Sequence, residues 1–146
     1  MKDKYLRETR MVDFSNPAIQ KLIQNMKWKE MGEFERIKAI YNYVRDDVLF
    51  GYNIDDGISA SKVLADGYGQ CNTKGTLFMA LLRACNIPCR VHGFTIDKRL
   101  QKGAMTGFVY RNAPKSIFHS WVEINFENQY VCRSEERFSR NAETDL

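Results

Sequence analysis

Cys71 is the side chain in this sequence best placed to act as a nucleophile. It follows Gly69 and Gln70 and precedes an apolar run over residues 77–82. Apolar residues recur there at helical spacing and Pro88 ends the segment, so the pattern predicts a buried helix that begins at Cys71. Free N–H groups and the dipole at a helix N-terminus favour the thiolate, the form that attacks carbon. Cys71 is therefore a candidate catalytic nucleophile.

His119 is the candidate proton acceptor for this thiol. Residues 118–124 alternate as a half-buried strand does, so His119 and Trp121 are expected on one face and their neighbours on the other. A thiolate beside an imidazole can attack an amide. The backbone N–H of Cys71 can then donate to the oxyanion, with the Gln70 side chain assisting. Taken singly, each residue is better explained structurally, Cys71 as an inert buried thiol and His119 as a strand residue hydrogen-bonded to its neighbours.

Three ordered motifs carry a resemblance to a known family. Gly69-Gln70-Cys71 is followed by Asn-Ile-Pro-Cys-Arg-Val-His-Gly at 86–93 and by His-Ser-Trp-Val-Glu at 119–123. Over roughly residues 35–131 this order resembles the transglutaminase-like superfamily of papain-type thiol enzymes. Three motifs in order are far more specific than any one of them.

The resemblance implies an activity and a set of site residues. Cys71 would attack an amide and His119 would take and return the proton. Gln70, Tyr68 and Trp121 are assigned to the oxyanion and substrate cleft. Water as the acceptor would give a peptidase or amidase, and an amine would give a cross-linking transferase. The chain resembles the hydrolytic branch more closely, since it has no acidic calcium-loop pattern.

The third catalytic residue departs from the family pattern. An aspartate on the return strand normally orients the imidazole, but the corresponding position here is Ser134. Residues 132–146 are polar and lack strand alternation. A hydroxyl would orient an imidazole only weakly, and Glu135 or Glu136 could substitute after a change of register. The alternative hypothesis is therefore a catalytically silent module that keeps the fold and binds a peptide.

The other histidine and the other cysteines receive structural interpretations. His92 is a rival base, but the family pattern does not use its position. Cys85 and Cys89 are expected to be reduced and buried as small hydrophobes. Spacings among the four cysteines, Cys132 included, match no common structural zinc pattern. We therefore expect neither a metal nor a cofactor.

Composition and length set broader limits. The 146 residues suit a single domain, 1–146, and 27% charged with 44% hydrophobic residues is ordinary for a globular protein. The net charge of +4 is scattered, so no nucleic acid is expected as a partner. No apolar stretch reaches the roughly 18 residues of a membrane span. A charged N-terminus without a signal peptide predicts a cytoplasmic protein whose partner is a peptide or protein amide. Its oligomeric state is not predicted.

The expected elements place helices before strands. Helices are predicted over residues 17–25 and 33–48, after a cap at Ser59 or Ser61, and from Cys71 onward. Strands are predicted over 88–96, 106–110, 118–126 and from 130 onward. This order predicts an α+β fold in which the nucleophile-bearing helix packs against a small antiparallel sheet.

Overall fold

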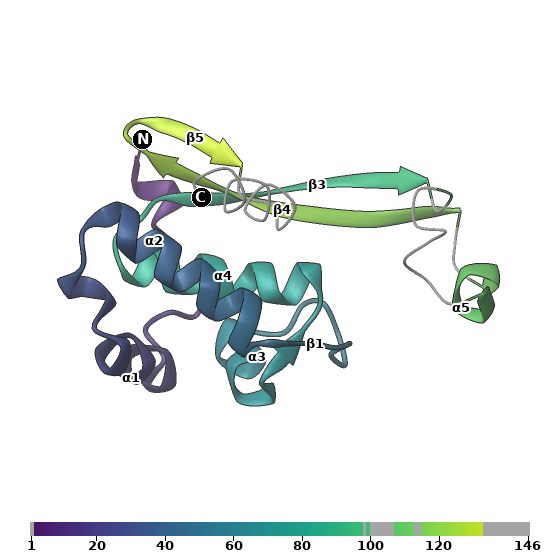
Figure 1. Cartoon of the computed structure of the whole chain (residues 1–146), viewed down its shortest axis with the longest axis horizontal. Helices are drawn as coiled ribbons and strands as arrows, with labels where there is room; N and C mark the ends of the chain where they lie inside the picture. The colour runs from purple at the N-terminus through teal and green to yellow at the C-terminus, as the bar shows by residue number, and fades with distance from the viewer. Residues whose placement is uncertain (1, 98, 100–106, 113–114, 133–146) are drawn as a thin grey trace, which may run out of the picture.

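The computed structural model describes residues 2–97, 99, 107–112 and 115–132 (Figure 1). Its helices are α1 (Pro17–Met26), α2 (Glu33–Asn42), α3 (Ala60–Asp66), α4 (Cys71–Ala84) and α5 (Gly107–Asn112). Its strands are β1 (Leu49–Phe50), β2 (Tyr68–Gly69), β3 (Cys89–Asp97), β4 (Ser116–Phe126) and β5 (Gln129–Cys132). Most helices precede the antiparallel strands, which confirms the predicted α+β class.

Two layers form the described part of the chain. Strands β3, β4 and β5 make an antiparallel sheet in that order, with Val91 opposite Val122 and Ile124 opposite Val131. Helix α4 packs against β3 and β4 on one side and against α1, α2 and α3 on the other. The long β3–β4 pair runs on beyond the helices toward α5 (Figure 1). Helix α4 is thus the central element of the fold.

Local capping explains where the first helices begin and end. The Asn16 side chain accepts from the N–H of Ala18 at 3.0 Å, and Pro17 takes the first position of α1. Ser59 caps α3, and Gly67 ends that helix in the left-handed conformation at φ 72°. Both helix starts agree with the sequence prediction.

The core gathers around α4. Residues 77–82 of this helix are all buried, and Trp28 is fully buried as well. The largest other fully buried apolar side chains are Ile19, Ile23, Ile40, Leu77, Leu81, Leu82, Ile87 and Ile124. Because the apolar faces of several helices and one face of the sheet meet here, burial of α4 fixes the position of both its ends.

Three local features of the structure differ from the sequence predictions. The strand predicted at 106–110 is wrong, since Gly107–Asn112 form α5. An isolated strand there would leave its backbone unpaired, whereas a helix satisfies it locally. The helix predicted over 33–48 changes at Tyr43–Asp47 into a π-helical turn. The parallel pair β1–β2 was not predicted at all.

Arg36 joins α2 to the far end of α4. Its guanidinium donates to the carbonyls of Trp28 at 2.8 Å and Cys85 at 3.1 Å. It also donates to the carbonyls of Lys29 at 3.1 Å and Met31 at 2.8 Å. Replacing Arg36 with methionine is expected to lower the free energy of unfolding by about 2 to 3 kcal/mol, because charged donors are lost from partly buried carbonyls. Urea denaturation followed by circular dichroism measures this.

The matched control is Lys38→Met on the exposed side of the same helix. A surface change of this kind should alter the free energy of unfolding by less than about 0.5 kcal/mol. Equal effects of the two substitutions would contradict the structural role of Arg36.

Candidate functional site at the start of helix α4

Cys71 is an exposed thiol at the first residue of α4. Gln70 precedes the helix in extended conformation, and its backbone N–H donates to Thr73 Oγ1 at 2.9 Å. In this contact the side chain of the third helical residue, Thr73, accepts from the backbone N–H of the residue before the helix. The prediction that α4 begins at Cys71, with residues 67–70 outside it, is confirmed.

Gly69 is required by close packing against the first turn of α4. A Cβ at this position would lie 2.7 Å from Thr73 Oγ1, 3.0 Å from Lys74 Cγ and 3.3 Å from Lys74 N. Thr73 cannot move away freely, because its hydroxyl donates to Asn53 Oδ1 at 2.6 Å. The glycine of the Gly-x-Cys motif thus lets the chain pass close to the helix that carries the thiol.

Replacing Gly69 with alanine is expected to lower the free energy of unfolding by about 1 to 3 kcal/mol, as overpacking at a fixed contact does. Thermal and urea denaturation measure the loss. Gly107→Ala is the control, because a Cβ there meets nothing within 4 Å. If both variants were equally stable, the packing explanation for the motif would be wrong.

A loop before α3 holds the residues on both sides of Cys71. The Asp56 carboxylate accepts from the side-chain amides of Gln70 and Asn72, the latter at 2.9 Å. Asn53 Nδ2 also donates to the carbonyl of Tyr68 at 3.0 Å. Sequence reasoning missed these loop residues. Its only signal was the turn at Asp55-Asp56-Gly57, which indicates a loop but not its partner.

Asn72 connects the thiol to strand β4. The Cys71 Sγ lies 3.7 Å from Asn72 Oδ1, and the same oxygen accepts from the Ser120 hydroxyl at 2.6 Å. Ser120 is the neighbour of His119 in β4. The structure therefore brings the start of α4 to the strand that carries the histidine.

The side chains of β4 alternate as predicted. Ser120 and Val122 are buried on the face toward α4, where Val122 Cγ2 would lie 3.6 Å from a Cβ at Gly75. His119 is half-buried on the opposite face, edge-on to the Phe94 ring at 5.4 Å between centroids. Among the described residues, the hydrogen bond of Cys71 Sγ goes to Asn72. The pairing of Cys71 with His119 therefore remains a prediction.

Trp121 and His92 form part of an aromatic cluster on the His119 face of the sheet. Their rings stack 5.6 Å apart, and Trp121 meets Phe94 edge-on at 4.8 Å. His92 Nε2 lies 3.1 Å from Glu123 Oε2. The Trp121 side chain thus packs against its aromatic neighbours on this face of the sheet.

Glu123 is the carboxylate of this face. It accepts from Arg90 Nε at 2.8 Å. Burial alone would raise the pKa of Glu123, but the hydrogen bond from Arg90 and the charges of His92 and Arg90 outweigh it, so the pKa is lowered. The ionised carboxylate thus holds two neighbouring side chains of β3 in place.

The remaining predicted cleft residues are placed as follows. Tyr68 is partly exposed on β2, and a Cβ at Gly51 would lie 2.8 Å from its ring. The Gln70 side chain is engaged by Asp56. Ser134, with Glu135 and Glu136, lies outside the described residues, so the source of a third catalytic group is not tested.

Cys85 and Cys89 are buried free thiols, and their predicted burial is confirmed. Burial raises the pKa of Cys85, and it raises that of Cys89 to about 11 despite the nearby Arg83. Of these described thiols, Cys71 is therefore the accessible one. Within the described ranges, no group of three or more His, Cys, Asp or Glu side chains is arranged to hold a metal ion. No helix in these ranges is long and apolar enough to cross a membrane.

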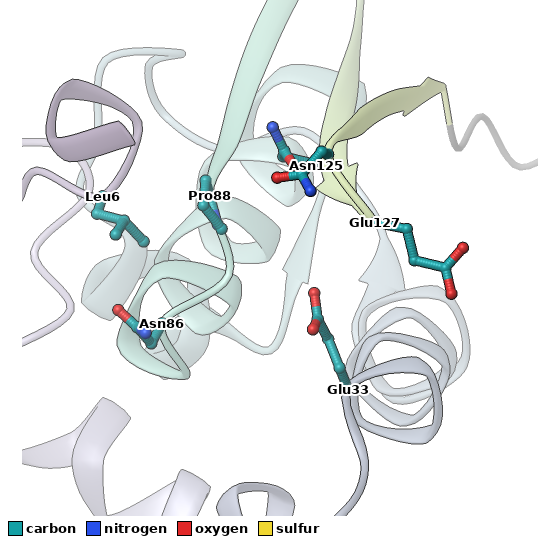
Figure 2. A pocket seen from close by; sticks show the side chains of 7 residues that line it. Leu6, Glu33, Asn86, Pro88, Asn125 and Glu127 are labelled. Carbon is teal, nitrogen blue, oxygen red and sulfur yellow. The ribbon is translucent and has the colours of Figure 1, made fainter. Parts of the chain in front are cut away.

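A pocket of about 340 Å³ lies at the opposite end of α4. Figure 2 shows its lining, which includes Glu33, Asn86, Asn125 and Glu127. A helix of 14 residues is about 21 Å long, so this pocket is remote from Cys71. It takes no part in the thiol site.

The fold and the placement of the thiol define a class of protein in which a cysteine opens the central helix beside an antiparallel sheet. The chain belongs to the transglutaminase-like superfamily, whose family model matches residues 20–132. In a comparison with curated proteins, none matches this sequence.

Two solved structures share the fold. A "putative cysteine protease" from Cytophaga hutchinsonii matches with a TM-score of 0.69 and 20% identity over 92% of this chain and 42% of that one. A "putative protease" from Parabacteroides distasonis matches with a TM-score of 0.55 and 17% identity over 91% of this chain and 25% of that one. The chain therefore spans less than half the length of either protein.

Proposed function

We propose that this protein catalyses thiol-dependent cleavage or transfer of peptide or protein amides, with Cys71 as the nucleophile. The observation that carries the proposal is the exposed thiol at the first residue of α4, held on both sides by polar contacts. Its place in a superfamily of thiol enzymes and the names of its structural neighbours support the same chemistry.

The proposed reaction has two steps. The Cys71 thiolate attacks the amide carbonyl carbon, and the backbone N–H of Cys71 donates to the oxyanion. His119 takes the proton of the Cys71 thiol and gives it to the leaving amine as the C–N bond breaks, and a thioester remains. This role requires the imidazole to reach the thiol from the face of β4 where it now meets Phe94. Water attacks the thioester in hydrolysis, whereas a second amine attacks it in transfer. The Gln70 side chain already donates to Asp56, which leaves the oxyanion to the backbone.

Hydrolysis is the branch we favour. The motifs resemble those of the hydrolytic members, and both structural neighbours carry protease names. The two branches separate in one assay, in which a peptide substrate is incubated with and without a primary amine. Release of free amine without incorporation of the added amine supports hydrolysis.

The reactivity of Cys71 tests the proposal directly. Iodoacetamide alkylation of the native chain at pH 6, followed by peptide mapping, gives a separate rate for each cysteine. Cys71 is expected to react at least about tenfold faster than glutathione, since a thiol that serves as a catalytic nucleophile is more reactive than a free one. A Cys71 rate at or below that of glutathione would overturn the catalytic proposal.

A second candidate function is a peptide-binding module without turnover. It is favoured by the hydrogen bond of Cys71 Sγ to Asn72 and by the contact of His119 with Phe94 on the far face of β4. Under this hypothesis, peptides would bind with equal affinity to the wild-type chain and to Cys71→Ser, and no product would form. Isothermal titration calorimetry combined with product analysis decides between the two.

A further inference from the structure

An exposed apolar strip, defined here as Phe50, Tyr52 and Ile54, lies on β1 and the residues that follow it. Their exposed fractions are 72%, 70% and 93%. The rings of Phe50 and Tyr52 meet edge-on at 5.5 Å. Strand β1 ends at Phe50, and Ile54 lies at a bend in the segment that follows. Large apolar side chains grouped on an exposed surface indicate a binding site for another molecule.

The strip borders the start of α4. Phe50 is paired with Gly69 across β1 and β2, and paired residues share a face of a sheet. A Cβ added at Gly69 would point toward Thr73 and Lys74 in the first turn of α4. Phe50 therefore lies on the side of the β1–β2 pair that adjoins the turn beginning with Cys71.

Hydrogen bonds fix the strip relative to the thiol. Asn53, which lies between Tyr52 and Ile54, accepts from Thr73 Oγ1 at 2.6 Å. Asp56, two residues beyond Ile54, accepts from Asn72 at 2.9 Å. The apolar side chains are thus exposed on a segment anchored at two points to the nucleophile turn. Side chains held at a fixed position relative to the nucleophile can position a substrate for attack.

The backbone of β1 also offers an open edge. The N–H groups of Leu49 and Gly51 donate to the carbonyls of Gly67 and Gly69, each at 3.0 Å. In a parallel pair, alternate residues bond to the partner strand, so the N–H and C=O of Phe50 point to the other side. Among the described strands, β1 has β2 as its partner. An extended peptide can add to such an edge through its backbone.

We propose that this strip is the acyl-side subsite and that the substrate is a polypeptide with apolar or aromatic residues next to the scissile amide. The inference rests on the proposed function, because it takes Cys71 as the nucleophile that the bound peptide must reach. An extended chain bonded along β1 lays its side chains over Phe50 and Tyr52 while its carbonyl carbon reaches the thiol.

Peptide chloromethyl ketones test the proposal on the full chain. Cys71 Sγ attacks the methylene carbon, the C–S bond forms, the C–Cl bond breaks, and the thiol proton passes to the base. Acetyl-Phe-Leu-Ala and acetyl-Glu-Lys-Ala chloromethyl ketones carry the same reactive group. The apolar reagent is expected to alkylate Cys71 at least about tenfold faster, equivalent to about 1.4 kcal/mol of preferential binding. Equal rates, or a preference for the charged peptide, would overturn the subsite.

The variant arm compares the same two reagents on Phe50→Ser/Tyr52→Ser. The ratio of the two rates should fall below about threefold, since the apolar surface is removed. Phe108→Ser on α5, where the side chain is 80% exposed, is the matched control and should keep the wild-type ratio. A ratio retained in the double variant would overturn the proposal. If the double variant fails to fold, the wild-type ratio still decides.

Failure of the subsite and failure of the catalytic proposal give different results. Slow alkylation of Cys71 by iodoacetamide contradicts the catalytic proposal whatever the peptide ratio. Fast iodoacetamide alkylation with equal peptide rates keeps Cys71 as the nucleophile and removes the strip as its subsite.

Discussion

Cys71→Ser is expected to reduce amide turnover to the level of the assay blank, a loss of at least about 10³-fold. The hydroxyl is a far weaker nucleophile than a thiolate, and a helix N-terminus cannot ionise it at neutral pH. The measurement is the rate of free amine released from a peptide substrate. Peptide binding by this variant should persist, because the surrounding contacts of Gln70 and Asn72 with Asp56 are retained.

Cys85→Ala is the control for this experiment. Its thiol is buried at the far end of α4, so the variant should turn over substrate at close to the wild-type rate. If Cys71→Ser retained the full rate, the catalytic site would have to lie elsewhere in the chain.

His119→Gln is expected to lower kcat by about 10² to 10⁴-fold, the usual contribution of a positioned acid–base group. Glutamine keeps much of the volume against Phe94 but cannot exchange a proton. The loss should appear in kcat more than in KM, because the imidazole acts on the transferring proton.

His92→Gln separates the two histidines. His92 is paired with Glu123 at 3.1 Å and stacked on Trp121, so we expect its replacement to change kcat by less than about threefold. The reverse outcome, with His92 essential and His119 dispensable, would assign the base to the rival residue. Small effects of both would favour the binding-module hypothesis.

The elements that position the thiol were predictable because their signals are local. The glycine break before Cys71, the polar caps at Asn16 and Ser59, and the alternation around His119 each act within a few residues. Burial then follows from periodicity, and the observed faces of α4 and β4 agree with it. Local patterns therefore predicted the helix start and the strand that form the candidate site.

The contacts that complete the site were not predictable in the same way. Asp56 reaches Gln70 and Asn72 across 14 and 16 residues, and Ser120 reaches Asn72 across 48. Polar side chains in loops have no period that indicates their partners. The two-residue strands β1 and β2 are also too short to show alternation. Only the folded chain shows which of these groups meet.

The central burial of α4 has a consequence for the motions of this protein. Because residues 77–82 are buried between the sheet and the other helices, their amide hydrogens can exchange with solvent only when the two layers separate. The exposed thiol at one end therefore stands on the slowest-exchanging segment we expect in the chain. On heating, the selective alkylation of Cys71 over the buried cysteines should be lost only when the whole protein unfolds. Fluctuations of the apolar strip should leave helix α4 intact.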